Sequence, residues 1–147
     1  KHKVLSETEM RARYEINLEN YIKTVNIEAL TMSVMARRDI FPAVSAYAAL
    51  VSENTVAKQK MGFGKAEGKL LNRLCTLTDS LFENIERLDK AVADAEKIKD
   101  TAALADYYRT EVIGAMNALR ADADALEYIT ADDCWPYPTY GEMLFSI

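Results

Sequence analysis

The stretch LLNRLCTLTDSLFENIERLDKAVADA, residues 70–95, decides the fold of this chain. Large apolar residues recur in it at alternating steps of three and four positions, close to a heptad seam. The residues of this seam are Leu70, Leu74, Leu77, Leu81, Ile85, Leu88, Val92 and Ala95. If one helix runs from Lys65 to Ile98, it is roughly 50 Å long at about 1.5 Å per residue. We interpret the seam as the core of a helical bundle rather than as a groove for a partner protein.

The sequence before this stretch also has helical periodicity. Ser6-Glu7-Thr8-Glu9 fits a capping box, which marks a helix start. A first apolar stripe follows, its register shifts near Asn26, and a second stripe continues, so one long bent helix and two abutting helices are both possible. The first stripe is Tyr14, Leu18, Tyr21 and Val25, and the second is Ile27, Leu30, Val34, Phe41, Val44, Ala48 and Val51. Pro42 should kink the second stretch, and MGFGKAEG (residues 61–68) is predicted to be a connector.

After the seam, Asp100 or Thr101 can cap a last helix. Its apolar residues are Leu104, Tyr108, Val112, Ala115, Met116, Leu119, Ala123 and Leu126. The short loop before it predicts an antiparallel arrangement, and no stretch shows the alternation of a strand. We therefore predict an all-α fold, an antiparallel bundle of three to four long helices. The whole chain, 1–147, is expected to be one domain, with the bundle in 1–127 and an extended aromatic docking tail in 128–147.

The last fifteen residues, DCWPYPTYGEMLFSI (133–147), differ from the rest. Pro136 and Pro138 lack amide donors and disfavour helix in the residues before them, so an extended conformation is predicted. The segment is dense in groups that act as anchors in pockets. The candidate docking residues are Trp135, Tyr137, Tyr140, Leu144 and Phe145. They could pack on another domain or fold back on the bundle, and the sequence leaves both open.

The bulk composition narrows the class of protein. Half of the 147 residues are apolar, and the net charge is −5, so no basic field would attract nucleic acid or an anionic membrane. No apolar run approaches the ~20 residues of a membrane span, and KHKVLSETEM lacks the core of a signal peptide. The two cysteines, Cys75 and Cys134, are too few for a disulfide scaffold, and we expect reduced thiols and a cytoplasmic location. A start at Lys1 fits both a piece of a longer chain and a removed tag.

No catalytic, cofactor-binding or metal-binding residue is predicted. The single histidine, His2, excludes a Ser-His-Asp or Cys-His arrangement, and Asp132-Asp133-Cys134 is interpreted as a solvated turn. The glycines of the connector have neither the dinucleotide nor the Walker spacing, so a loop between helices is expected. Arg37 and Arg38 interrupt an apolar stripe. They are candidate interface residues that could bind a carboxylate of a neighbouring helix or subunit, or they could lie on a solvated face with a local Arg-Asp pair.

Two strings carry a resemblance to a known family. RYEINLENYIKTVNIEALTMSVMARRDIFPAV (13–44) closely resembles the opening of the C-terminal helical region of type III glutamine synthetases. WPYPTYGEMLF (135–145) resembles the end of the same long, bacterial-type enzymes, and KHKVLSETEM fits the join after their catalytic domain. The strings bracket the chain, whereas residues 52–125 add little.

This resemblance implies a parent enzyme that ligates ammonia to glutamate with ATP and Mg²⁺ or Mn²⁺ and assembles as stacked hexameric rings. The family's metal, ATP and glutamate motifs are absent from this sequence, so no catalytic residue can be transferred to it. The expected role is accessory and related to assembly, with the catalytic domain of the same polypeptide and neighbouring subunits as partners. The alternative is a free-standing helical-bundle interaction module that binds a partner protein through its seam or through Arg37 and Arg38.

Overall fold

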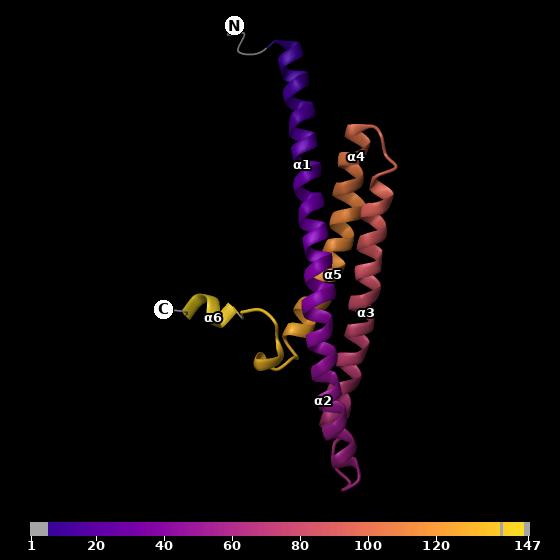
Figure 1. The fold of residues 1–147 in the computed structure, drawn as a ribbon, viewed down its shortest axis with the longest axis vertical. Helices are drawn as coiled ribbons and strands as arrows, with labels where there is room; N and C mark the ends of the chain where they lie inside the picture. The colour runs from indigo at the N-terminus through magenta and orange to yellow at the C-terminus, as the bar shows by residue number, and fades with distance from the viewer. Residues whose placement is uncertain (1–5, 139, 146–147) are drawn as a thin grey trace.

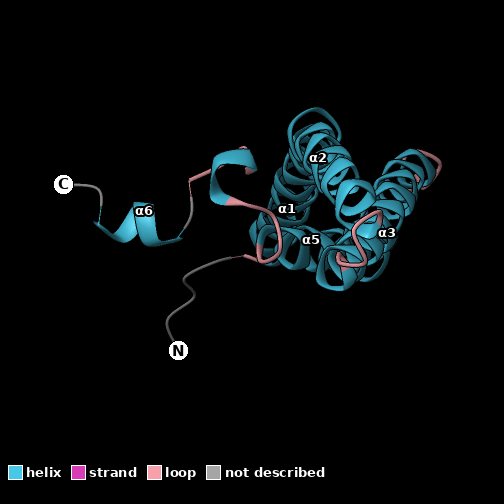
Figure 2. Cartoon of the chain, turned by 90° about the horizontal axis from the view of Figure 1, so that it is seen from below, coloured by secondary structure: helices cyan, strands magenta, loops and turns pink. Residues whose placement is uncertain are grey.

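Across residues 6–138 and 140–145, which are the residues it describes, the computed structural model consists of three long helical rods and a short tail (Figure 1). The rods run down, up and down the molecule, so consecutive rods are antiparallel, and the predicted all-α bundle is confirmed. In chain order the elements are α1 (Glu7–Met35), the π-helical turn η1 (Ala36–Ile40), α2 (Phe41–Gln59), α3 (Lys65–Ala95), α4 (Thr101–Tyr107), the π-helical turn η2 (Tyr108–Val112), α5 (Ile113–Glu127), the 3₁₀ turn η3 (Asp132–Cys134) and α6 (Tyr140–Phe145). Seen end-on, the rods surround one core and the tail leaves to one side (Figure 2).

Side-chain caps begin the helices where the sequence predicts them. Ser6 Oγ accepts a hydrogen bond from Glu9 N at 3.2 Å, and Ser6 N donates to Glu9 Oε2 at 2.7 Å, which completes the capping box of α1. Of the two cap candidates before the last rod, Asp100 fills the role, because its Oδ2 accepts from Ala103 N at 2.8 Å. Each cap satisfies amide donors that the first helical turn leaves unpaired.

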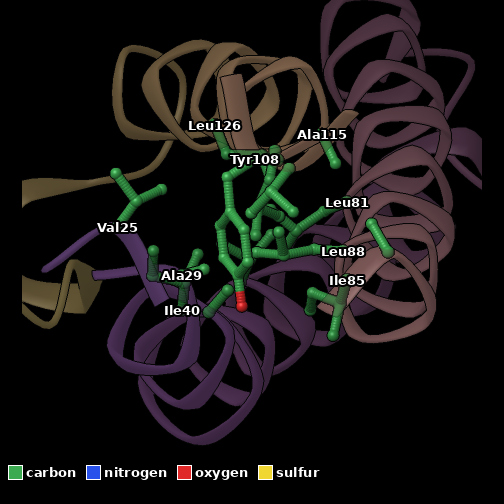
Figure 3. Close-up of a cluster of buried hydrophobic side chains, with 14 of the residues drawn as sticks. Val25, Ala29, Ile40, Leu81, Ile85, Leu88, Tyr108, Ala115 and Leu126 are labelled. Carbon is green, nitrogen blue, oxygen red and sulfur yellow. The ribbon is translucent and has the colours of Figure 1, made fainter. Parts of the chain in front are cut away.

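The predicted seam of α3 forms the centre of the core (Figure 3). Of its members, Leu74, Leu81, Ile85, Leu88 and Ala95 are buried, whereas Leu70, Leu77 and Val92 are half-buried and pack against the core. Burial of each leucine side chain removes apolar surface from water and contributes about 1.5–3 kcal/mol. From the last rod, Tyr108 points into this cluster, and its hydroxyl donates to Asn26 Oδ1 on α1 at 3.0 Å. The polar tip of a buried tyrosine is thereby satisfied.

The stripe predicted after Asn26 is wrong over α1 but confirmed over α2, where Val44 and Val51 are buried and Phe41 and Ala48 pack against the core. Ile27, Leu30 and Val34 are 64%, 49% and 51% exposed. The residues of α1 and η1 that face the core are instead Val25, Ala29, Ser33, Ala36 and Ile40. The physical reason is that α1 continues through Asn26 without a break. The residues that follow Val25 at steps of three or four positions therefore stay on the same, core-facing side of the helix. Small side chains fill the middle of that row, whereas the larger apolar residues Ile27, Leu30 and Val34 lie on the opposite face.

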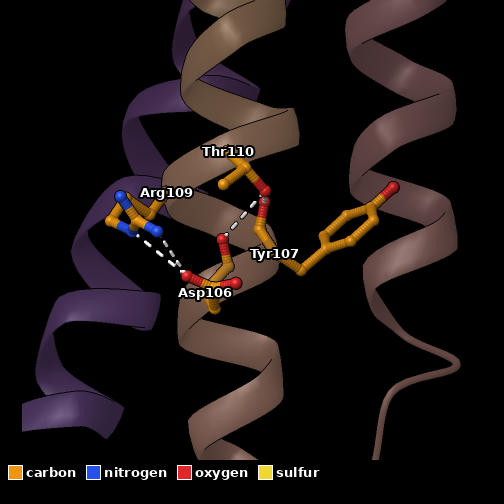
Figure 4. Close-up of polar contacts among 4 residues, drawn as sticks. All are labelled: Asp106, Tyr107, Arg109 and Thr110. Carbon is orange, nitrogen blue, oxygen red and sulfur yellow. Dashed lines mark hydrogen bonds and ion pairs between the residues drawn. The ribbon is translucent and has the colours of Figure 1, made fainter.

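The first rod and the last rod each contain a π-helical turn. In η1, Phe41 N donates to Ala36 O, and Pro42 follows at the start of α2. The helix therefore continues past the proline, whose missing amide comes directly after a turn that already departs from α-helical bonding. From η2, the Thr110 hydroxyl donates to Asp106 O of α4 at 3.0 Å, and Arg109 Nη2 donates to Asp106 Oδ1 at 2.7 Å (Figure 4).

The tail differs from the predicted extended segment. After α5, the chain forms the turn η3, and after Pro138 it forms the short helix α6, which projects away from the bundle (Figure 1). The prolines disfavour helix only at the residues just before them, so a helix can begin beyond Pro138. Trp135 and Tyr137 pack against the bundle core as half-buried side chains.

Candidate docking groove

A groove of about 620 Å³ lies between α1 and the last rod, and the tail forms one of its walls. Its lining residues are Ile27, Glu28, Thr31, Met32, Met35, Ala36, Ile40, Met116, Leu119, Arg120, Ala123, Asp124, Glu127, Trp135, Tyr137, Pro138 and Met143. The floor of the groove is apolar. Several of the lining residues are methionines, whose flexible side chains adapt to partners of different shape. We refer to this hollow as the groove.

The apolar surface extends beyond the groove along α1. Ile27 lines the groove, and Leu30 and Val34 lie one and two turns further along the same side of the helix. All three are large apolar residues with exposed side chains. A contiguous apolar face of this kind is a common sign of a binding surface.

The rim of the groove is acidic. Asp124 pairs with Arg120, whose Nε lies 3.5 Å from Asp124 Oδ2. For Glu28 and Glu127, no hydrogen bond or ion pair is present among the residues that the structure describes. The rim therefore carries excess negative charge, and a partner with lysine or arginine next to apolar anchors would complement it.

The tail is fastened to η1. The Tyr137 hydroxyl donates to Asp39 Oδ2 at 2.6 Å, and burial together with this hydrogen bond to a carboxylate raises the pKa of Tyr137 to about 12. Of the candidate docking residues, Trp135 and Tyr137 thus lie on this chain's own bundle. Leu144 is 76% exposed, and the side chains of Tyr140 and Phe145 lie outside the described part of the structure.

The two candidate arginines have different surroundings. Arg37 Nη2 lies 2.5 Å from Asp89 Oδ2 on α3, and Ser33 Oγ donates to the other oxygen of Asp89, also at 2.5 Å. Arg37 therefore contacts a carboxylate of a neighbouring helix, as one of the two interpretations of the sequence had it. Arg38 is exposed and has no ion pair within residues 6–138 and 140–145.

The connector between α2 and α3 forms an exposed tip at the far end of the molecule (Figure 1). We refer to residues 60–65 as the hairpin tip. Met61 and Phe63 are 67% and 71% exposed, and Gly62 and Gly64 adopt positive φ angles of 81° and 94° that close the turn. Lys58 pairs with Glu67, which ties the start of α3 to the end of α2.

The structure also bears on metal binding, membrane crossing and the reactivity of a thiol. Within the described residues, no group of three or more histidine, cysteine, aspartate and glutamate side chains could hold a metal ion, and no helix is long and apolar enough to cross a membrane. The pKa of the Cys134 thiol is raised, mainly by burial and to a smaller extent by the nearby Asp133 carboxylate. The raised pKa disfavours the nucleophilic thiolate. His2 lies outside the described residues.

The groove, its acidic rim and the bond between Tyr137 and Asp39 were not predicted from the sequence. Trp135 and Tyr137 gave one signal, because large aromatic residues at a chain end need a surface to pack on. Nothing in the sequence paired them with Asp39, which is 98 positions earlier in the chain than Tyr137.

Comparison with known proteins gives consistent matches. Residues 1–60 match the family model described as the glutamine synthetase C-terminal domain. The whole chain aligns with a glutamine synthetase of Butyrivibrio fibrisolvens at 38% identity, covering 21% of that protein. A type-3 glutamine synthetase of Dictyostelium discoideum is 30% identical over 97% of the chain and 20% of its own length. A glutamine synthetase of Bacteroides fragilis is 26% identical over 98% of the chain and 21% of its own length. The chain thus spans about a fifth of the length of these curated relatives.

Proposed function

Because the chain belongs to the glutamine synthetase C-terminal domain family, we propose that it serves as the accessory, assembly-related helical domain of a type III glutamine synthetase. The parent polypeptide would ligate ammonia to glutamate with ATP and Mg²⁺ or Mn²⁺, in the cytoplasm. The observation that carries this proposal is the alignment of the entire chain with about a fifth of each longer synthetase. The remaining four fifths of such a protein is where the catalytic residues would lie.

The two halves of the tail support a docking role in different ways. The inner half is held on the bundle by Trp135 and by the hydrogen bond of Tyr137. The outer half, α6, projects away and exposes Met143 and Leu144, at 57% and 76%. A segment that is anchored at one end and apolar at the other suits contact with the catalytic domain or a neighbouring subunit.

The test is to place Leu144→Asp in the longer synthetase that contains this chain. We expect a smaller particle in sedimentation velocity, because a charge would be buried without a partner at the contact. Leu50→Asp is the matched control, since Leu50 is 52% exposed on α2 and lies outside the groove and the tail. Equal particle masses for both variants and the unaltered enzyme would contradict the proposal.

Trp135→Ala provides a second, independent variant. Loss of this side chain removes a wall of the groove and loosens the base of the tail, so α6 would be presented in many orientations. We expect weaker ring assembly and a lower thermal midpoint of the enzyme. Tyr128→Ala, at a residue that is 87% exposed, should leave both unchanged.

A free-standing helical-bundle interaction module is the alternative. The groove favours it, because an apolar floor with an acidic rim can bind a partner without a catalytic domain. An antibody against this domain separates the two on extract of the source cells. A band several times heavier than 16.5 kDa supports the synthetase domain, and a band at 16.5 kDa supports the free-standing module.

A further inference from the structure

The hairpin tip has the properties of a ligand. Met61 and Phe63 project two large apolar side chains into solvent, with exposed fractions of 67% and 71%. Lys60 and Lys65 flank them and are exposed, and neither has an ion pair within the part of the chain that the structure describes. Exposed apolar side chains are costly to leave in water, and the ammonium groups beside them favour a partner surface of opposite charge.

The groove has the complementary properties. Its floor is apolar, and its rim carries Glu28 and Glu127, whose carboxylates have no partner among the described residues. The one cation on the rim, among the lining residues, is Arg120, and Asp124 already neutralises it. Tip and groove therefore match in both apolarity and charge.

The tip cannot reach the groove of its own molecule. α2 and α3 pack against each other and hold the tip at one end of the bundle (Figure 1). The groove is lined by residues of α1, η1, α5 and the tail, away from that end. The turn itself is fixed by Gly64, where a Cβ would lie 3.2 Å from Lys58 Cβ, and by the ion pair of Lys58 with Glu67. A second molecule must supply the tip.

We propose that the hairpin tip of one copy docks into the groove of a second copy, with Phe63 and Met61 on the apolar floor and Lys60 and Lys65 facing Glu28 and Glu127. The contact joins different surfaces of the two copies, so it is head-to-tail, and repetition of it closes a ring or extends a filament. This inference deepens the assembly role proposed above, but it does not use Leu144, and the one residue of α6 among those that line the groove is Met143.

The first test is sedimentation of the 147-residue chain over a range of concentrations. We expect reversible self-association that weakens with salt, and Phe63→Ser should raise the dissociation constant by about tenfold or more. Met61→Ser has a matched control in Met10→Ser, because Met10 is a similarly exposed methionine, at 60%, at the opposite end of the first rod. A chain that stays monomeric up to about 1 mM, the range of very weak binding, or one whose association Phe63→Ser leaves unchanged, would overturn the proposal.

A charge exchange tests the contact itself. Glu28→Lys with Glu127→Lys makes a basic groove, and Lys60→Glu with Lys65→Glu makes an acidic tip. Each double variant alone should remain monomeric, since its tip and groove repel. When the two are mixed, tips and grooves of opposite sign are restored, and association should return. Association of either variant alone as strong as that of the unaltered chain, or no association in the mixture, would overturn the head-to-tail contact.

The outcomes separate this inference from the proposed function. Failure of the tip variants with a normal effect of Leu144→Asp in the synthetase would leave the accessory role intact and remove only the head-to-tail contact. The opposite result would establish the contact and place the tail outside the assembly. All substituted residues of the tip are exposed, so circular dichroism should show unchanged helix content in each variant.

Discussion

The Tyr137 hydroxyl donates a hydrogen bond to Asp39 Oδ2 at 2.6 Å and so joins the tail to the first rod across 98 positions of sequence. This contact holds the wall of the groove that Trp135, Tyr137 and Pro138 provide. This wall of the groove therefore depends on the hydrogen bond of Tyr137 and on the packing of two aromatic rings against the bundle core.

Removal of that hydrogen bond should loosen the tail. Tyr137→Phe keeps the ring and deletes the donor, at an expected cost of about 1 kcal/mol to tail docking. Trp135 is the only tryptophan in the chain, so acrylamide quenching of its fluorescence reports on this segment alone. We expect stronger quenching in Tyr137→Phe and none of this change in Tyr128→Phe, whose residue is 87% exposed. Equal quenching in all forms would show that ring packing alone holds the tail.

The tail should also loosen at alkaline pH. The pKa of Tyr137 is raised from 10.0 to about 12 in the folded chain, so folding favours the protonated phenol. This contribution to stability is fully present below pH 10 and is lost as the pH rises through about 12. Absorbance at the phenolate band should show one tyrosine titrating near pH 12 that is missing in Tyr137→Phe. An identical alkaline end to both titrations would exclude the assignment.

Asp89 should stabilise the pairing of α1 with α3. It accepts from Ser33 Oγ and pairs with Arg37, both at 2.5 Å. Because Arg37 and Asp89 are 47% and 44% exposed, water screens the pair, and we expect Asp89→Asn to lower the free energy of unfolding by only about 1 kcal/mol. Urea unfolding measures the change. Asp79→Asn, at an exposed residue of the same helix, should have an effect near zero.

The register of α1 can be tested by exchanging side-chain sizes on its two faces. Ala29 is 0% exposed, so Ala29→Leu should overpack the core and cost about 1–3 kcal/mol. Leu30 is 49% exposed, and Leu30→Ala should cost much less than the ~2–5 kcal/mol typical of a buried leucine, for which Leu81→Ala is the reference. Thermal unfolding of the variants would contradict this register if Leu30→Ala were as damaging as Leu81→Ala.

Two glycines should respond to alanine in opposite directions. Gly64 has φ +94°, and a Cβ there would lie 3.3 Å from Thr55 O, so Gly64→Ala should destabilise the hairpin by about 1–2 kcal/mol. Gly114 is helical with nothing within 4 Å of an added Cβ, so Gly114→Ala should stabilise by about 0.5–1 kcal/mol. Chemical unfolding of both variants checks the sign, and destabilisation by Gly114→Ala would show that the last rod has less room than the structure gives it.

The buried face of a helix was predicted best from the sequence in α3. Leu81, Ile85 and Leu88 are large, regularly spaced and fully buried, so their periodicity alone predicted the helix and its core face. The same reasoning failed in α1, because Ala29 and Ser33 bury little apolar area and Ile27 offers more. Apolar size predicts the buried face only where the neighbouring helix lies far enough away to need a large side chain.

The candidate site was predictable in part. Trp135 and Tyr137 were identified as docking residues from their density near the chain end, and the structure places them on the wall of the groove. The acidic rim of the groove could not be predicted, because Glu28 and Glu127 are ordinary helix-surface residues in the sequence. They line one groove only once α1 and α5 lie side by side. The exposed tip was predicted only as a connector.

The sequence by itself determined the helical rods, their capped starts and the glycine turn between α2 and α3, because each depends on residues within a few positions of one another. The tertiary structure alone decided which face of α1 is buried, where the tail packs and which carboxylates line the groove. Those outcomes depend on the distance and rotation between helices, which many side chains set together when they fill the core at close packing.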